Sequence, residues 1–334
     1  MARTDVEGNT EQKQRAGELV HNAYGKSKVR LTKVNRHQDR HELKELSIDI
    51  QLEGAFDESY ITGDNTQVIA TDSMRNTVYV LAAKEEIADI ESFGKTIARH
   101  FLSTYTQVTA CSITLVEELW QPITNDRGQP HPNAFFGAGA EKHCAFVSGT
   151  RDSIKVESAV DGLNLVKTTD SEFWGFVRDQ YTTLQEVKDR IFGTSVTARW
   201  LYGTENPDYQ ANYEAVRNTI LEVFATHKSL GVQHTIHEIA QVALERLSEL
   251  SEITITMPNK HRILFNLQPF GLENKNEIFV ATDEPHGLIS ATIKRMLLRS
   301  FTLLVFASVL GEGNTDGLPL ASTAKYANFL RETF

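Results

Sequence analysis

Two stretches of the chain share one pattern, and this internal similarity constrains the fold more than any other feature. Residues 97–120, IARHFLSTYTQVTACSITLVEELW, resemble residues 239–261, IAQVALERLSELSEITITMPNKH. Each has apolar residues at helical spacing, a short polar break, and then β-branched residues typical of a strand. The wider order of strands, two helices and strands also occurs twice. It predicts two copies of one α+β unit with an antiparallel sheet. The alternative is chance, because a helix followed by a strand is a common pattern.

The elements of this repeat follow from the spacing of apolar residues and from turn-forming residues. The predicted strands are 29–36, 41–54, 108–123, 155–160, 163–169, 195–203 and 252–261, the predicted helices are 73–83, 89–105, 209–228 and 233–248, and the predicted loops are 55–67 and 125–135.

Composition narrows the class of partner and the compartment. A formal charge of −10 argues against nucleic acid as the main partner, although it allows a local basic pocket for a small anion. The longest apolar run, residues 301–310, is too short to span a membrane, and residues 1–21 lack the apolar segment of a signal peptide. The two cysteines are too few for a disulfide framework, and residues 332–334 are not the peroxisomal Ser-Lys-Leu ending. We expect a cytoplasmic, and most simply bacterial, protein.

Metal and nucleotide sites have little support in the sequence. His37 and His41 are four residues apart without a third ligand, and His234 and His237 are three apart, which is not the spacing of a zinc helix. A phosphate-binding loop of the form G-x-x-x-x-G-K-[ST] is absent, and so is the G-x-S-x-G of hydrolases. We therefore expect no metal site.

What remains is a set of polar and aromatic residues beside the apolar segments. They are Tyr24-Gly25-Lys26, Ala70-Thr71-Asp72-Ser73, Phe173-Trp174-Gly175-Phe176, Asp189-Arg190-Ile191, Val232-Gln233 and Pro258-Asn259-Lys260-His261. Each has an ordinary explanation when taken alone. The ordinary explanations are a surface lysine for Lys26, a helix cap for Asp72 or Ser73, a core residue for Phe173, a carboxylate-paired side chain for Arg190 and a turn former for Asn259.

Together, these segments resemble the urate oxidases (uricases), a family with the tunnelling fold, or T-fold. The stretches that carry the resemblance are YGK at 24–26, GDN at 63–65, ATDS at 70–73, NTVY at 76–79, FWGFVRDQYTTLQE at 173–186, DRI at 189–191, VQ at 232–233 and PNKH at 258–261. The most specific are the long 173–186 motif followed by DRI, and the joint occurrence of ATDS and PNKH. The similarity runs from about residue 22 to about residue 293, in the family's order.

For the fold, the resemblance implies two tandem T-fold units per chain and four chains around a tunnel. The expected divisions are a tail at 1–21, a first unit at 22–150, a second unit at 151–293 and a C-terminal helical tail at 294–334. The active sites of such proteins lie between subunits.

For the activity, the resemblance implies cofactor-independent oxidation of urate by O2 to 5-hydroxyisourate and hydrogen peroxide, the first step of urate degradation. A relay of Lys26, Thr71 and His261 would move protons. Substrate contacts would come from Thr71, Asp72, Phe173, Arg190, Val232, Gln233 and Asn259. One chain would supply Lys26 and Thr71, and its neighbour would supply Phe173, Arg190, Gln233 and His261.

Two other functions compete with this hypothesis. Another T-fold enzyme acting on a purine or pterin would typically bind its substrate through a glutamate and often use zinc, whereas this chain has Gln233. A non-enzymatic binding protein derived from the fold is argued against by the intact Lys26, Thr71 and His261.

Overall fold

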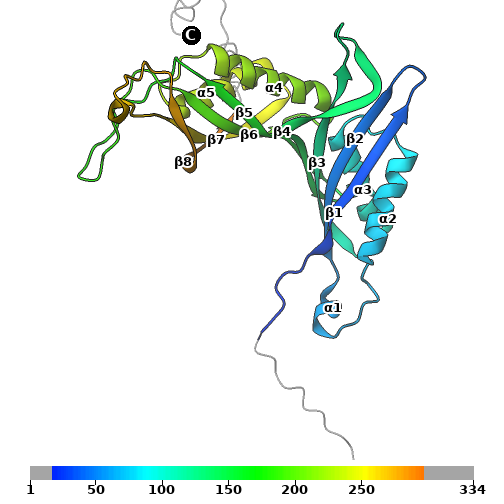
Figure 1. Cartoon of the computed structure of the whole chain (residues 1–334). Coiled ribbons are helices and arrows are strands. Elements are labelled where there is room, and N and C mark those ends of the chain that lie inside the picture. The colour runs from blue at the N-terminus through cyan, green and yellow to red at the C-terminus, as the bar shows by residue number, and fades with distance from the viewer. Residues whose placement is uncertain (1–16, 297–334) are drawn as a thin grey trace, which may run out of the picture. The chain divides into compact units, whose positions relative to one another are not determined.

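The computed structural model describes residues 17–296, with the side chain of Asp283 excepted, and its central feature is one antiparallel sheet (Figure 1). Its eight strands lie in sequence order from β1 to β8. The strands are β1 (Tyr24–Arg36), β2 (His41–Gly54), β3 (Val108–Thr124), β4 (Pro130–Thr150), β5 (Ile154–Lys167), β6 (Phe192–Tyr202), β7 (Leu250–Leu264) and β8 (Phe279–Lys294). Since every strand pairs with its neighbours in the chain, β1 and β8 form the two edges of the sheet.

The helices follow the second strand of each half, as the repeat predicts. Between β2 and β3 lie α1 (Asp57–Ile61), α2 (Thr71–Lys84) and α3 (Ile90–Thr104), and between β6 and β7 lie α4 (Tyr209–Thr226) and α5 (Val232–Arg246). A short 3-10 helix, η1 (Gln268–Phe270), lies between β7 and β8. The α+β class with an antiparallel sheet is confirmed.

Two separate hydrophobic cores lie between the helices and the sheet. The first gathers buried residues between Val29 and Val147, and the second gathers buried residues between Val160 and Met257. Helix α3 illustrates the cause, because Phe93, Ile97 and Phe101 fall on one face and are all buried. The two cores support the proposed division near residue 150, which stays a prediction.

Several predicted elements were wrong in extent. The 55–67 segment, predicted as a loop, contains α1. The turn at 125–135 ends earlier, because β4 already begins at Pro130, and prolines at the start of a strand conceal such a strand in the sequence. The strands predicted at 155–160 and 163–169 are one strand, β5, interrupted only by a register shift between Val160 and Leu163.

Strand β8 was not predicted at all. Its sequence, FVATDEPHGLISATIK, contains two acidic residues and a proline that break the apolar alternation. The strand reaches Lys294, where the C-terminal helical tail at 294–334 was expected to begin. Apart from its first residues, that tail lies outside the described part of the chain, as does most of the expected 1–21 tail.

A buried polar network connects the two halves at the middle of the sheet. Glu91 on α3 is fully buried, and its Oε1 accepts hydrogen bonds from His143 Nε2 at 2.8 Å and from Ser158 Oγ at 2.5 Å. The other ring nitrogen of His143 lies 3.5 Å from Glu117 Oε2. The ring of Tyr213, on α4 of the second half, stacks on the imidazole with centroids 3.8 Å apart. The imidazole therefore lies between two carboxylates and under an aromatic ring.

Charge on His143 stabilises this junction. Burial disfavours the charged ring, but the hydrogen bonds to Glu117 and Glu91 outweigh it and raise the pKa of His143 to about 9. An unfolded histidine titrates near 6.5. The stabilisation is therefore complete below about pH 6.5 and is lost as the pH rises through about 9.

We predict that His143→Gln removes this pH dependence, because glutamine does not titrate. The thermal midpoint of the wild-type chain, measured at fixed protein concentration, should exceed that of the variant most at pH 6, and the gap should narrow towards pH 9.5. His131→Gln is the matched control, since His131 is an exposed histidine on the same strand. A gap that stays constant with pH would show that His143 is neutral in the fold.

Candidate functional site

A cavity of about 880 Å³ opens where β7 and β8 meet the start of α5 and the segment between β5 and β6. Its lining residues are Phe173, Thr183, Leu184, Gln185, Val187, Arg190, Val232, Gln233, Asn259, His261, Arg262, Ile263, Leu264, Gly287 and Ile289. Six of the residues singled out in the sequence are therefore brought together, from segments up to 88 residues apart between Phe173 and His261.

Backbone hydrogen bonds hold the segment that carries Phe173. Glu172 N donates to Ser229 O at 2.7 Å, and Ser229 N donates to Asp170 O at 2.9 Å. Phe173 and Val187 exchange two bonds, of 2.8 and 3.0 Å. The loop is thus fastened to the turn before α5, which fixes the aromatic ring at the wall of the cavity.

Helix α5 begins at the cavity without a side-chain cap. Val232 and Gln233 are its first two residues, and Gly231 precedes them without capping the helix. The first backbone N–H groups of a helix have no acceptor within the helix, and the helix dipole favours negative charge there. The start of α5 therefore offers donors to an anionic group in the cavity.

Arg190 adds a full positive charge to the same wall. Its Nε donates to Ser171 Oγ at 3.4 Å, and its guanidinium carbon lies 5.4 Å from the centre of the Phe173 ring, within cation–π range. Burial lowers the pKa of this guanidinium. Among the described carboxylates of residues 17–296, Asp283 excepted, none forms an ion pair with it, so the carboxylate partner considered from the sequence is not found there.

Asn259 and His261 lie on β7 beside an irregularity in its pairing with β8. Asn259 faces Gly287, whereas His261 faces Thr282, so β8 inserts extra residues between these positions. Burial lowers the pKa of His261, and the nearby positive charge of Arg190 lowers it further. The imidazole is thus neutral near pH 7, in a position to accept a proton.

Lys26, Thr71 and Asp72 belong to a second group in the first half. Lys26 lies on β1 opposite Ile50, and Thr71 is the first residue of α2. Tyr24 connects the two segments, since its hydroxyl accepts a bond from Ile69 N at 2.7 Å and donates to Ile69 O at 3.2 Å.

The capping role considered for Asp72 or Ser73 was wrong. Ala70 occupies the cap position of α2, and no side chain caps this helix. Asp72 instead forms an exposed ion pair with Arg75 at 2.6 Å. The first N–H groups of α2 are consequently also open to an external acceptor.

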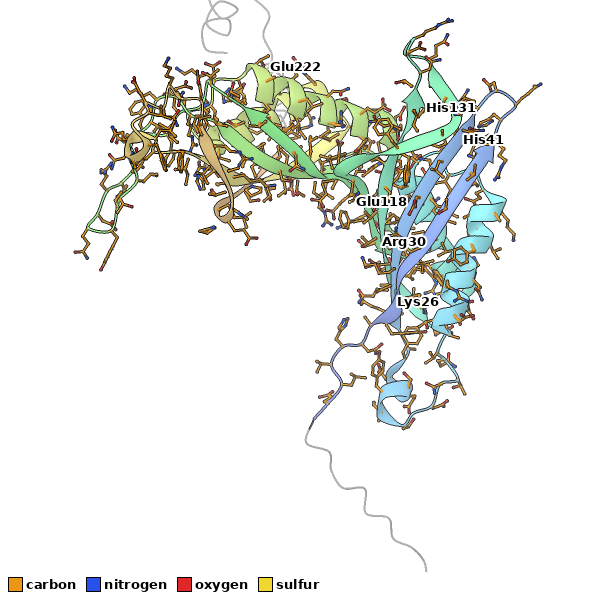
Figure 2. All side chains as sticks on the ribbon, viewed as in Figure 1. Lys26, Arg30, His41, Glu118, His131 and Glu222 are labelled. Carbon is orange, nitrogen blue, oxygen red and sulfur yellow. The ribbon has the colours of Figure 1, made fainter. Side chains whose placement is uncertain are left out.

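The two groups lie towards opposite edges of the sheet. Figure 2 shows Lys26 at the start of β1, the first edge strand, whereas the cavity is built on β7 and β8 at the other edge. Neither Lys26 nor Thr71 lines the cavity. The chain therefore does not bring the predicted proton-relay residues to one place.

Some lining residues gave no usable signal in the sequence. Arg262 directly follows His261, and the alternation of a strand would send the two side chains to opposite faces. Val187 and Gly287 are lining residues that belong to no recognised motif.

Two searches of the described residues were negative. Residues 17–296 contain no group of three or more His, Cys, Asp or Glu side chains arranged to hold a metal ion. None of the helices in this range is long and apolar enough to cross a membrane.

Comparison with known proteins gives consistent matches over most of the chain. A family model described as "Uricase" matches residues 22–148 and 156–290. The chain is 41% identical over 277 residues to a uricase of Arthrobacter globiformis, covering 83% of this chain and 90% of the relative. It is 39% identical over 280 residues to a uricase of Dictyostelium discoideum, covering 83% and 97%. The crystal structure of the Arthrobacter globiformis uricase aligns with a TM-score of 0.79 at 38% identity, covering 92% of this chain and 100% of that one.

We predict that Arg190→Gln raises the pKa of His261 towards its ordinary value, because the substitution removes a positive charge near the imidazole. The pH dependence of the carbethoxylation rate of His261, followed by mass spectrometry, measures this pKa. Arg178→Gln, on an exposed part of the same segment, should leave it unchanged. An unaltered pKa of His261 in the Arg190→Gln variant would show that the charge of Arg190 does not act on His261.

Proposed function

The chain belongs to the uricase family, and we propose that it oxidises urate with O2 to 5-hydroxyisourate and hydrogen peroxide. The observation that carries the proposal is the convergence of Arg190, Phe173 and the start of α5 on one cavity. An unpaired guanidinium, an aromatic ring and free helix N–H groups together suit a flat anion. Urate is such an anion.

The lining residues provide a contact for each part of urate. Arg190 donates two parallel hydrogen bonds to one edge of the ring, which a planar guanidinium does well. Gln233 supplies one donor and one acceptor to the adjacent N–H and C=O groups, while the backbone of Val232 adds a contact. Phe173 stacks on the face of the ring. From the other group, Thr71 contributes its backbone N–H near Asp72.

The reaction transfers two electrons from urate to O2. Oxygen gains two protons to become hydrogen peroxide, and a water molecule adds to the oxidised ring to give 5-hydroxyisourate. Asn259 holds O2, and later the attacking water, above the ring. No metal or organic cofactor takes part in the proposed scheme, because urate itself is easily oxidised.

Proton movement falls to Thr71, Lys26 and His261. A threonine hydroxyl is a weak base alone, so Lys26 exchanges protons with it. The neutral His261 completes the relay by accepting a hydrogen bond from the lysine, because its lowered pKa leaves a ring nitrogen unprotonated near pH 7.

This relay requires a second copy of the chain. Lys26 and Thr71 lie towards the β1 edge, away from the β7–β8 cavity, so a neighbouring subunit must supply them. We propose a homotetramer around a tunnel, with each active site between two subunits. The unpaired edges β1 and β8 support it, as do the exposed side chains Ile263, Leu264 and Leu288 near the cavity.

A cytoplasmic location is part of the same proposal. Cys111 and Cys144 are both free and buried, which fits a reducing compartment. The alternative of a different T-fold enzyme acting on a purine or pterin is not favoured, since the matched family is uricase.

We predict that the purified chain, treated with a chelator, consumes urate and O2 in equal amounts and releases hydrogen peroxide. Urate absorbance, an oxygen electrode and a peroxide assay measure the three quantities. If the absorbance of urate does not fall in air, the proposed function is contradicted. If activity is present without the chelator and lost with it, only the claim that the reaction needs no metal is contradicted.

We predict that Thr71→Ala and Lys26→Met each lower kcat by about 100-fold, the typical size of an acid–base contribution. Ser73→Ala and Lys28→Met are the matched controls, because both wild-type side chains are exposed close to the relay residues. Normal turnover in Thr71→Ala or Lys26→Met would make those two residues structural.

We predict that Arg190→Lys mainly raises KM, because lysine cannot donate the parallel pair of hydrogen bonds. Steady-state kinetics with urate separate KM from kcat. An unchanged KM would show that urate does not bind through Arg190.

A further inference from the structure

We propose that Arg262 is a second anion-attracting residue of the cavity, which draws urate towards Arg190 through its charge rather than through a fixed contact. The inference rests on the proposed function and deepens it. It assigns to one cavity residue a role in selecting and capturing a negatively charged substrate.

The position of Arg262 is defined by two neighbours. Its Nη1 donates to the backbone oxygen of His261 at 2.9 Å. Its guanidinium lies over Gly193 of β6, because a Cβ atom built at Gly193 would be 3.8 Å from both the guanidinium carbon and Nη2. One hydrogen bond leaves the remaining N–H donors of this guanidinium available.

The charge of Arg262 is not neutralised by the described protein. No ion pair joins it to any of the described carboxylates of residues 17–296, which do not include Asp283, and none of the residues that line the cavity is acidic. Arg190 and Arg262 thus give the cavity two positive charges. This arrangement contrasts with the formal charge of −10 on the whole chain.

This contrast gives Arg262 a physical function. A chain with net negative charge repels an anionic substrate at a distance, and a cavity lined by positive charge concentrates it locally and raises its association rate. Arg190 is held against Phe173 and Ser171, so its fixed orientation suits contact with urate that has already bound. Arg262, by contrast, is held through a backbone oxygen of its own strand, so its charge is the property that matters for capture.

The test compares charge with shape at position 262. The variants are Arg262→Gln, which removes the charge, and Arg262→Lys, which retains it. Arg127→Gln is the matched control, since it changes the net charge equally from an exposed turn between β3 and β4. The measurements are kcat and KM for urate at low and at high ionic strength, and the association rate of urate under nitrogen by stopped flow.

We expect Arg262→Gln to lower kcat/KM and the association rate by roughly 3- to 10-fold at low salt, the size of one screened charge near the site. The loss should shrink at high salt, because ions screen the attraction. Arg262→Lys and Arg127→Gln should both resemble the wild type, and kcat should hardly change in any variant.

Three results would overturn the proposal. One is Arg262→Gln behaving like Arg127→Gln. The second is a loss of the same size at every salt concentration. The third is an Arg262→Lys variant that is as impaired as Arg262→Gln. The second and third results would each indicate a structural role of Arg262 through its bond to His261. A wild-type chain that binds urate under nitrogen without consuming it in air would instead contradict the proposed function, and the binding rates would still decide the role of Arg262.

Discussion

The pairing of every strand with its neighbour in the chain is the constraint on which the rest of the structure depends. It produces one antiparallel sheet in which β1 and β8 are the edges. Residues of the first half, including Lys26 and Thr71, therefore stay towards one edge, while the cavity with Arg190 and His261 forms towards the other. A single chain with this strand order contains both parts of the proposed active site but cannot join them. Association of copies then becomes a chemical requirement of the proposed reaction.

In the proposed function, the cavity combines features that are unfavourable until urate binds. Arg190 is largely removed from water without a carboxylate partner, and α5 presents uncapped N–H groups beside it. Both lose solvation in the free protein and regain partners when a flat anion enters. Burial keeps His261 neutral, and the positive charge of Arg190 adds to this effect, because a charged imidazole would be repelled by it. In the proposed reaction, substrate binding and proton transfer therefore depend on the same charged and buried groups.

Sequence patterns predicted the parts of the fold whose apolar residues are periodic. Helix α3 is an example, since one face supplies its buried residues. Strand β8 escaped prediction because its charged residues and proline hide the alternation. The buried Glu91–His143 contact was not predicted either. Charged side chains are expected at the surface unless a partner far along the chain is known. Six site residues named from motifs line one cavity, whereas Arg262 enters it only through the local geometry of β7.

Subunit complementation tests the central claim, that each active site needs residues from two copies, most directly. Chains with Lys26→Met and chains with Arg190→Gln, each nearly inactive alone, would be unfolded together in equal amounts and refolded into mixed oligomers. Random assembly leaves about one quarter of the interface sites with both native residues, so the mixture should recover up to about a quarter of the wild-type activity. Mixed oligomers that form, as shown by native mass spectrometry, yet stay inactive would contradict a site shared between subunits.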